Sequence, residues 1–334
     1  MRAKFTGAVV LVALGAVLAG CGGDDDKRTA GCSAQPNTHA LVYRVRGSAT
    51  PATLDATVAK LCERARLAGA SVDVRRVGRD RIEIRSAKPL NPELRRSIGS
   101  RGRLAFYDWE PNVRPPGNQQ PAPTREAAVQ IASAQRPRAE AEDVPAGGPS
   151  PEVKSRFGGD TSRIEAYYDV QNDSSAAGDA PRGIVVLTGE QTVPRTASPG
   201  AWVLEDDSEL SGADITNAKQ EFDPQTNEPI VSFEFTDIGR AAFARVTKRE
   251  AVRGANVQLE PGGDRQATLQ RFAIALDDSI VSLATIDYIQ NPKGISGDSG
   301  AQINGLGTIG DTRRIADTLN VGTLPVELDF LSSR

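Results

Sequence analysis

The sequence predicts an α+β protein whose first ordered part has the element order of a ferredoxin-like fold. Two observations lead to this. Several short segments alternate apolar and polar residues, which is the two-residue period of a half-buried strand. Between them, residues 54–65 and 94–98 repeat apolar side chains three or four positions apart, as amphipathic helices do. Residues 41–108 therefore read as strand, helix, strand, strand, helix, strand.

Two helix starts of the same kind support the helices of this first block. Thr50 before Pro51, and Asn91 before Pro92, each place a capping side chain ahead of a proline at the first helical position. Gly69 is typical of the position that ends a helix. Strands are expected at residues 41–45, 72–74, 82–84 and 104–106, and the turn at 78–80 makes the middle two a hairpin.

A second ordered block begins near Gly183. Thr236 is expected to cap a helix that ends before a loop at 253–267. Val231, Phe233 and Phe235 alternate and are interpreted as one strand's core face, with a client-binding surface as the alternative. The remaining expected elements are strands at 184–187, 202–204, 213–222 and 229–235, a hairpin at 272–286, a helix at 309–319 and a last strand at 326–330.

Between the two blocks, residues 111–182 are rich in proline, glycine, alanine and glutamine. This composition indicates a long insertion of low order, interrupted by one helix at 125–134.

The N-terminus has the pattern of a bacterial lipoprotein signal. Arg2 and Lys4 precede an apolar run at 5–19, and Cys21 directly follows Leu-Ala-Gly, the small-residue spacing of a lipobox. We therefore expect a signal peptide at 1–20, lipid on Cys21 and a flexible tether at 21–40. An ordinary signal peptide or a short anchor helix is the alternative.

The other two cysteines, Cys32 and Cys62, would lie in an oxidising compartment and could pair. A disulfide between them would fix the tether to the first helix. Closing a loop of about 30 residues stabilises by roughly 3 kcal/mol in the chain-entropy model. The alternative is a buried thiol at Cys62 and a solvent-exposed one at Cys32.

Composition excludes several classes of function. The net charge of −3 gives no basic field for phosphates, so nucleic acid is not an expected partner. His39 is the one histidine, and it is interpreted as a surface residue, so a histidine-based catalytic set is not expected. With three cysteines in all, no tetrahedral zinc set remains. We expect no cofactor, no metal and no enzymatic activity.

Two further motifs have simpler explanations. Residues 305–310 match the glycine pattern of a dinucleotide-binding turn, but no strand–helix–strand unit surrounds them. We interpret them as a strand exit followed by a helix with Thr308 as its cap and Asp311 in its first turn. The acidic runs at 24–26 and 205–207 are interpreted as solvated loops.

Taken together, the ordered segments resemble the large extracytoplasmic domain of the protein-export membrane protein SecD. No single motif decides this, but the matching stretches occur in the family's order over nearly all of the mature chain. They are residues 67–84, 102–109, 210–223, 228–231, 235–243, 272–277, 300–303 and 322–328.

The resemblance implies a ferredoxin-like base subdomain built from both chain ends, at 41–110 and 305–334, with an inserted α+β head subdomain at 183–304. The head is implied to bind emerging polypeptide and to move relative to the base. In contrast to the family, lipid is expected to replace the first membrane helix, and no membrane bundle is expected after Arg334.

The leading hypothesis is therefore a lipid-anchored SecD-like module on the outer side of the cell membrane. It would bind unfolded preprotein segments or the Sec translocon and assist export passively. The alternative is a structural or interaction lipoprotein that keeps the fold without export activity. Peptide-contacting residues are not identified by the sequence.

Overall fold

The computed structural model describes residues 32, 39–114, 121–135, 154, 183–189, 200–257 and 268–334. It confirms a mixed α+β fold, with three sheets in the described part of the chain. The predicted signal peptide at 1–20, Cys21, and most of the tether and of the insertion lie outside these residues.

The first sheet is built from both ends of the chain and forms the body called here the base. Its order is β13-β1-β3-β2, with all neighbours antiparallel. Helices α1 and α2 contribute Leu61 and Ile98 to its core. The strands are β1 (His39–Val45), β2 (Val72–Val77), β3 (Arg81–Ser86) and β13 (Leu328–Ser333), and the helices are α1 (Pro51–Leu67) and α2 (Pro92–Gly99).

The predicted helix starts are confirmed. The side chain of Thr50 accepts a hydrogen bond from the backbone of Thr53, and that of Asn91 accepts one from Leu94. Gly69 follows α1 with a φ of 70°, a backbone conformation that glycine adopts without strain.

The strand at 104–108 does not close the sheet formed by the other strands of the first block. As β4 (Leu104–Asp108) it pairs with β10 and β7 in the second sheet, and β13 lies beside β1 instead. The reason is burial on both faces: Leu104 and Phe106 pack into one core cluster, while Ala105 and Tyr107 pack into another. Such a strand fits the interior of a larger sheet covered on both sides.

The second sheet has six strands in the order β6-β5-β11-β10-β4-β7. Its strands are β5 (Ile184–Gly189), β6 (Gly200–Glu205), β7 (Leu210–Ser211), β10 (Gln270–Leu276) and β11 (Ser279–Ile286) in addition to β4. Helix α3 (Trp109–Asn112) directly follows β4, and helix α4 (Arg125–Ser133) packs on β5 and β6.

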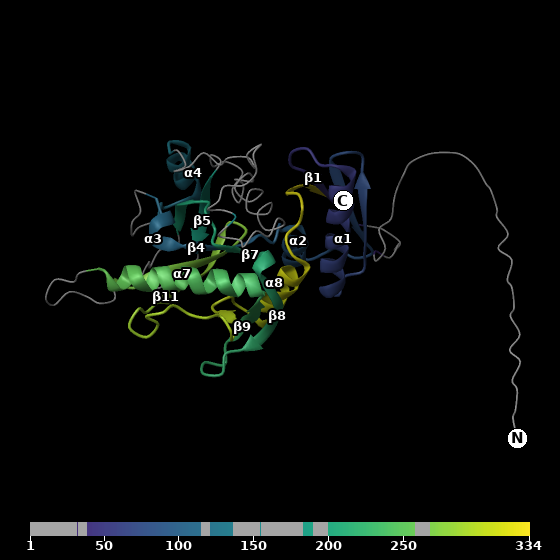
Figure 1. Cartoon of the computed structure of the whole chain (residues 1–334). Helices are drawn as coiled ribbons and strands as arrows, with labels where there is room; N and C mark the ends of the chain where they lie inside the picture. The colour runs from purple at the N-terminus through teal and green to yellow at the C-terminus, as the bar shows by residue number, and fades with distance from the viewer. Residues whose placement is uncertain are drawn as a thin grey trace, which may run out of the picture.

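The third sheet has the order β12-β9-β8 and shares a core with the second. Its strands are β8 (Ile215–Phe222), β9 (Pro229–Phe235) and β12 (Ala301–Ile303). Helix α7 (Asp237–Ala255) runs across the middle of the molecule in Figure 1, and α8 (Ile309–Val321) packs on β8 and β9 while also contacting α1. The second and third sheets with their helices are called here the large lobe.

Three details differ from the sequence predictions. Residues 212–214 form a short 3-10 helix, so β8 begins at Ile215. Helix α7 continues to Ala255, because Arg253 is held by buried partners described below. The last strand starts two residues later than expected, at Leu328.

Other predictions are confirmed. Val231, Phe233 and Phe235 are buried in the core of the large lobe. Thr308 and Asp311 form a reciprocal capping box at the start of α8, as the glycine-rich motif predicted.

Candidate functional site

Of the site residues predicted from the sequence, Cys21 lies outside the described residues, and the others lie in or against the base. Cys32 and Cys62 are joined as a disulfide with a Cα–Cα distance of 5.6 Å, which lies in the usual range. Cys62 is buried in α1, and Cys32 packs against the same core. His39 begins β1 and is half-buried.

Two chain segments cross between the base and the large lobe, and Arg64 of α1 holds both. Its guanidinium donates to the carbonyl oxygen of Arg101 at 3.0 Å on the outgoing segment and to that of Gly322 at 2.9 Å on the returning one. It also donates to the carbonyl of Ser100. Burial lowers the pKa of Arg64 to about 10, while nearby Asp277 acts in the opposite direction. Arg64 remains charged at neutral pH.

The crossing segments are also bonded to each other. The backbone N–H of Leu324 donates to the carbonyl of Arg101 at 2.8 Å, and the hydroxyl of Thr323 donates to the carbonyl of Gly102 at 3.2 Å. Gly102 has a φ of 71°, and a Cβ there would lie 2.7 Å from a methyl group of Thr318. Glycine is therefore required at this crossing for both conformation and space.

Immediately after Gly102, the chain is fixed to the large lobe. The backbone N–H of Arg103 donates to Asp277 at 2.8 Å, and its buried guanidinium donates to Asp206 at 2.6 Å. Asp206 also accepts from the hydroxyl of Tyr107 at 2.6 Å. Burial alone would lower the pKa of Arg103, but the charge of Asp206 raises it overall. Gly102 thus lies between a residue held from the base and one held inside the large lobe.

This arrangement corrects the interpretation of the acidic run at 205–207 as a solvated loop. Glu205 and Asp206 are buried, and Asp206 is the charge partner of Arg103. The sequence signal was weak because the two partners lie far apart in the chain.

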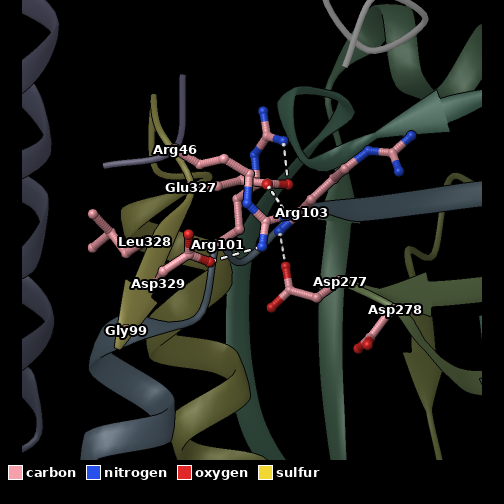
Figure 2. Close-up of a pocket in the computed structure, with 9 residues that line it drawn as sticks. All are labelled: Arg46, Gly99, Arg101, Arg103, Asp277, Asp278, Glu327, Leu328 and Asp329. Atoms are coloured by element: carbon pink, nitrogen blue, oxygen red, sulfur yellow. Dashed lines mark hydrogen bonds and ion pairs between the residues drawn. The ribbon is translucent and has the colours of Figure 1, made fainter. Parts of the chain in front are cut away.

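A cleft of about 190 Å³ opens beside the crossing segments (Figure 2). On its base side, Arg46 pairs with Glu327 at 3.0 Å and with Asp329 at 2.7 Å, and Arg101 reaches Glu327 at 3.3 Å. Asp277, on the turn between β10 and β11, lies on the side of the large lobe. The cleft is therefore walled by both bodies and lined mainly by charged side chains.

Asp277 connects this cleft to the second sheet. Burial raises its pKa, and the hydrogen bond from the backbone of Arg103 acts against that rise. Its φ of 55° places it in the left-handed region, which aspartate tolerates better than most residues. The turn therefore meets the crossing segment through a constrained residue.

A second buried charge cluster lies where α7 meets β4, and sequence reasoning missed it. Asp108 is fully buried and accepts from Arg249 at 3.2 Å and from Arg253 at 3.1 Å. Glu250, on the same helix, is also fully buried, and neither of its carboxyl oxygens has a hydrogen-bond partner among the described residues. Burial, aided by the charges of Asp108 and Glu110, raises the pKa of Glu250 to about 10.

Within the described residues, we find no group of three or more histidine, cysteine or acidic side chains arranged to hold a metal ion. No helix in that part of the chain has the length and apolar character needed to cross a bilayer. The described geometry is that of two bodies joined at a tightly bonded crossing.

Comparison with known proteins finds similarity to SecD and SecDF proteins. A family model described as the SecDF P1 head subdomain matches residues 189–326. This range includes α8, whereas the sequence analysis placed the end of the head at residue 304. In the structure α8 packs on β8 and β9 of the large lobe and on α1 of the base.

Curated relatives are protein translocase subunits SecD. That of Calditerrivibrio nitroreducens is 27% identical over 196 residues, covering 57% of this chain and 34% of the relative. That of Thermobaculum terrenum is 34% identical over 125 residues, covering 37% and 19%. That of Rickettsia prowazekii is 27% identical over 193 residues, covering 56% and 32%. The chain matches about a third or less of the length of these relatives.

Solved structures of SecDF are also similar. One, in the super-membrane-facing form, has a TM-score of 0.48 and 21% identity, covering 89% of this chain and 30% of that one. Another, described as a membrane component that enhances protein export, has a TM-score of 0.47 and 20% identity, covering 88% and 98%. The sequence matches make this chain similar to the P1 domain of SecD, with the head subdomain matched at residues 189–326.

Proposed function

We propose that this chain is a SecD-like extracytoplasmic module that binds translocating or unfolded segments of exported proteins, or the Sec translocase, and assists export passively. The observation that carries the proposal is the P1 head match at 189–326. Among the described residues, two crossing segments join the large lobe, which contains most of this range, to the base. The relatives' role in protein translocation supports the choice of partner.

We further infer that the base is ferredoxin-like. Its sheet order β13-β1-β3-β2, with antiparallel neighbours, supports this, because the fold's fourth strand lies beside its first. The chain would leave this unit after α2, build the large lobe, and return through α8 to supply the last strand. A head inserted in this way can change its angle to the base while both remain folded.

Gly102 is the proposed pivot. Arg64 holds the residues before it to the base, and the Arg103–Asp206 pair holds the residue after it to the large lobe. On the returning segment, Arg64 holds Gly322 and Lys60 holds Val321 to the base, so rotation about Gly102 would require these two hydrogen bonds to break or α8 to move with the base. The charged cleft of Figure 2 would widen or narrow with that rotation.

Binding of an extended chain would be passive. Strand edges hold a peptide through main-chain hydrogen bonds with little sequence specificity. Such binding keeps a chain that has diffused outward from sliding back, and it needs no energy source in the module itself.

The test is the affinity of the full chain, in detergent micelles, for a reduced, unfolded secretory precursor, with the same precursor in its folded state as control. We expect binding of the unfolded form at micromolar concentration. No binding at high micromolar concentration would overturn the proposal. In a pull-down from envelope extracts, recovery of Sec components would support binding to the translocase. Recovery of another stable partner without Sec components would favour a structural lipoprotein.

Membrane attachment through Cys21 is a separate part of the proposal. Two or more acyl chains make a stable anchor where one does not. Cells grown with labelled palmitate should incorporate label into the wild-type chain but not into Cys21→Ser, with Cys32→Ser as the matched control. Equal labelling of Cys21→Ser would refute lipid attachment at this residue.

A further inference from the structure

The outer side of β13 is an open strand edge. Among the described residues β13 pairs only with β1. The backbone N–H of Arg46 donates to the carbonyl of Glu327, and hydrogen-bonded and non-hydrogen-bonded pairs alternate along antiparallel strands. Leu328 and Phe330 are therefore at non-hydrogen-bonded positions, so their backbone N–H and C=O groups point away from β1, towards the open edge.

This edge exposes apolar side chains where edge strands usually carry protective ones. Phe330 and the neighbouring Leu331 are 51% and 40% exposed. Natural edges are commonly blunted by lysine, proline, a β-bulge or a covering element, because an unprotected apolar edge attracts another strand. The register of β13 against β1 shifts once, between Phe330 and Ser332. Only Asp329 supplies a charge within β13.

An apolar pocket of about 560 Å³ adjoins the same edge, between β13 and α2. Its lining comes from β1, β13 and α2 with the residue after it, and includes Tyr43, Pro92 and Leu328. Phe330 forms one wall, edge-on to the ring of Tyr43 at 5.7 Å between centroids. The guanidinium of Arg95 lies 5.9 Å from the centre of the Phe330 ring, and Arg96 also lines the pocket.

The edge and the pocket together fit one kind of ligand. A peptide added to β13 would place every second side chain on the helix-facing side, over the pocket between strand and helix. In β-addition the main chain gives affinity and pockets for alternate side chains give specificity. The pocket favours a large apolar side chain, and Arg95 and Arg96 favour an acidic side chain beside it.

We propose that the open edge of β13 and the pocket between β13 and α2 bind an extended polypeptide segment carrying a large apolar side chain next to an acidic one. This rests on the proposed function, because it names a second client-binding surface on the same module. It places that surface on the base, at the strand through which the chain returns from the large lobe.

The test uses the full chain and a fluorescent ten-residue peptide of alternating valine and serine with one central phenylalanine and one neighbouring glutamate. We expect Phe330→Ala to weaken binding, measured by fluorescence anisotropy, at least tenfold. Phe222→Ala is the matched control, since Phe222 is 49% exposed and lies at the end of an edge strand of the large lobe. It should bind as the wild type does.

Three further measurements make the result independent of folding defects. The same peptide with alternate backbone nitrogens methylated keeps its side chains but loses main-chain donors, and it should bind wild type at least tenfold more weakly. Hydrogen exchange should show protection of the Phe330 amide when the unmodified peptide is added, because that amide faces the open edge. Replacing the peptide's glutamate by lysine should also weaken binding.

The outcomes separate this inference from the proposed function. Binding that survives Phe330→Ala but is lost in Phe222→Ala would move the site to the large lobe, which overturns this inference and leaves the proposed function standing. Failure of wild type to bind either the peptide or an unfolded precursor would overturn both. Phe330 protection that rises with protein concentration, without peptide, would assign the edge to a second copy of the chain and overturn the inference.

Discussion

The backbone N–H of Leu324 donates to the carbonyl oxygen of Arg101 at 2.8 Å, so the segment that leaves the base and the segment that returns to it are bonded to each other. Arg64 donates to both of the same segments. A rotation between base and large lobe would therefore have to break these bonds or leave both crossing segments moving with the base.

Replacing Gly102 tests how tightly this crossing is packed. In Gly102→Ala the new Cβ would lie 2.7 Å from a methyl group of Thr318 on α8, in a backbone with a φ of 71°. We expect the free energy of unfolding, measured by urea denaturation, to fall by about 2–3 kcal/mol. Gly78→Ala is the control, because Gly78 has a φ of 72° with nothing within 4 Å. Equal losses in the two variants would mean that Gly102 is conformationally required but not tightly packed.

Removing the Arg64 guanidinium should loosen both crossing segments together. Arg64→Met keeps much of the side-chain volume but leaves the carbonyls of Arg101 and Gly322 without that donor. We expect a loss of roughly 2–4 kcal/mol and faster hydrogen exchange at the Leu324 amide. Arg66→Met, at an exposed residue paired with Glu63, should change neither. Unchanged exchange at Leu324 in Arg64→Met would show that the backbone bond alone holds the crossing.

The helices and the hairpin of the base could be predicted from the sequence because their signals are local. The caps of Thr50 and Asn91, and the hairpin at 72–86, each depend on residues close together in the chain. The sheet that β4 joins could not be predicted from local signals. A strand with apolar residues on one face and small or aromatic ones on the other reads like an ordinary alternating strand, and only long-range packing assigns it to the second sheet.

The buried charges escaped prediction for a related reason. From the sequence alone, Asp206 is part of an acidic loop and Arg253 begins a loop. The structure pairs Asp206 with Arg103 and Arg253 with Asp108. In both cases one partner lies at an end of β4, and the other belongs to an element about a hundred or more residues later in the chain. Charge patterns along a sequence indicate solvated surface unless the tertiary partner is known.

The Arg103–Asp206 pair should be essential for anchoring the crossing to the large lobe. Asp206→Asn removes the charge that stabilises a buried guanidinium, and breaking a buried pair from one side is strongly destabilising. We expect a loss of about 3 kcal/mol in urea denaturation. Asp80→Asn, at an exposed residue of the β2–β3 turn, should leave stability unchanged. A loss below about 1 kcal/mol in Asp206→Asn would mean that solvent compensates Arg103 after the substitution.

Glu250 should make the protein less stable as the pH rises. Burial, then the charges of Asp108 and Glu110, raise its pKa from the ordinary 4.5 to about 10. Between these values the folded state holds a proton that the unfolded state has released, so raising the pH lowers the free energy of unfolding. One such proton gives a slope that approaches about 1.4 kcal/mol per pH unit.

Glu250→Gln removes this proton while keeping the side chain's size. In urea denaturation between pH 5 and 9, the free energy of unfolding of the variant should rise relative to that of wild type as the pH rises. The gain should be smallest at pH 5. Glu228→Gln, which changes an exposed residue before β9, is the control. Its difference in free energy of unfolding from wild type should stay constant over this pH range. If Glu250→Gln also runs parallel to wild type, then Glu250 is ionised in the folded protein, and Arg249 and Arg253 must compensate its charge as they do that of Asp108.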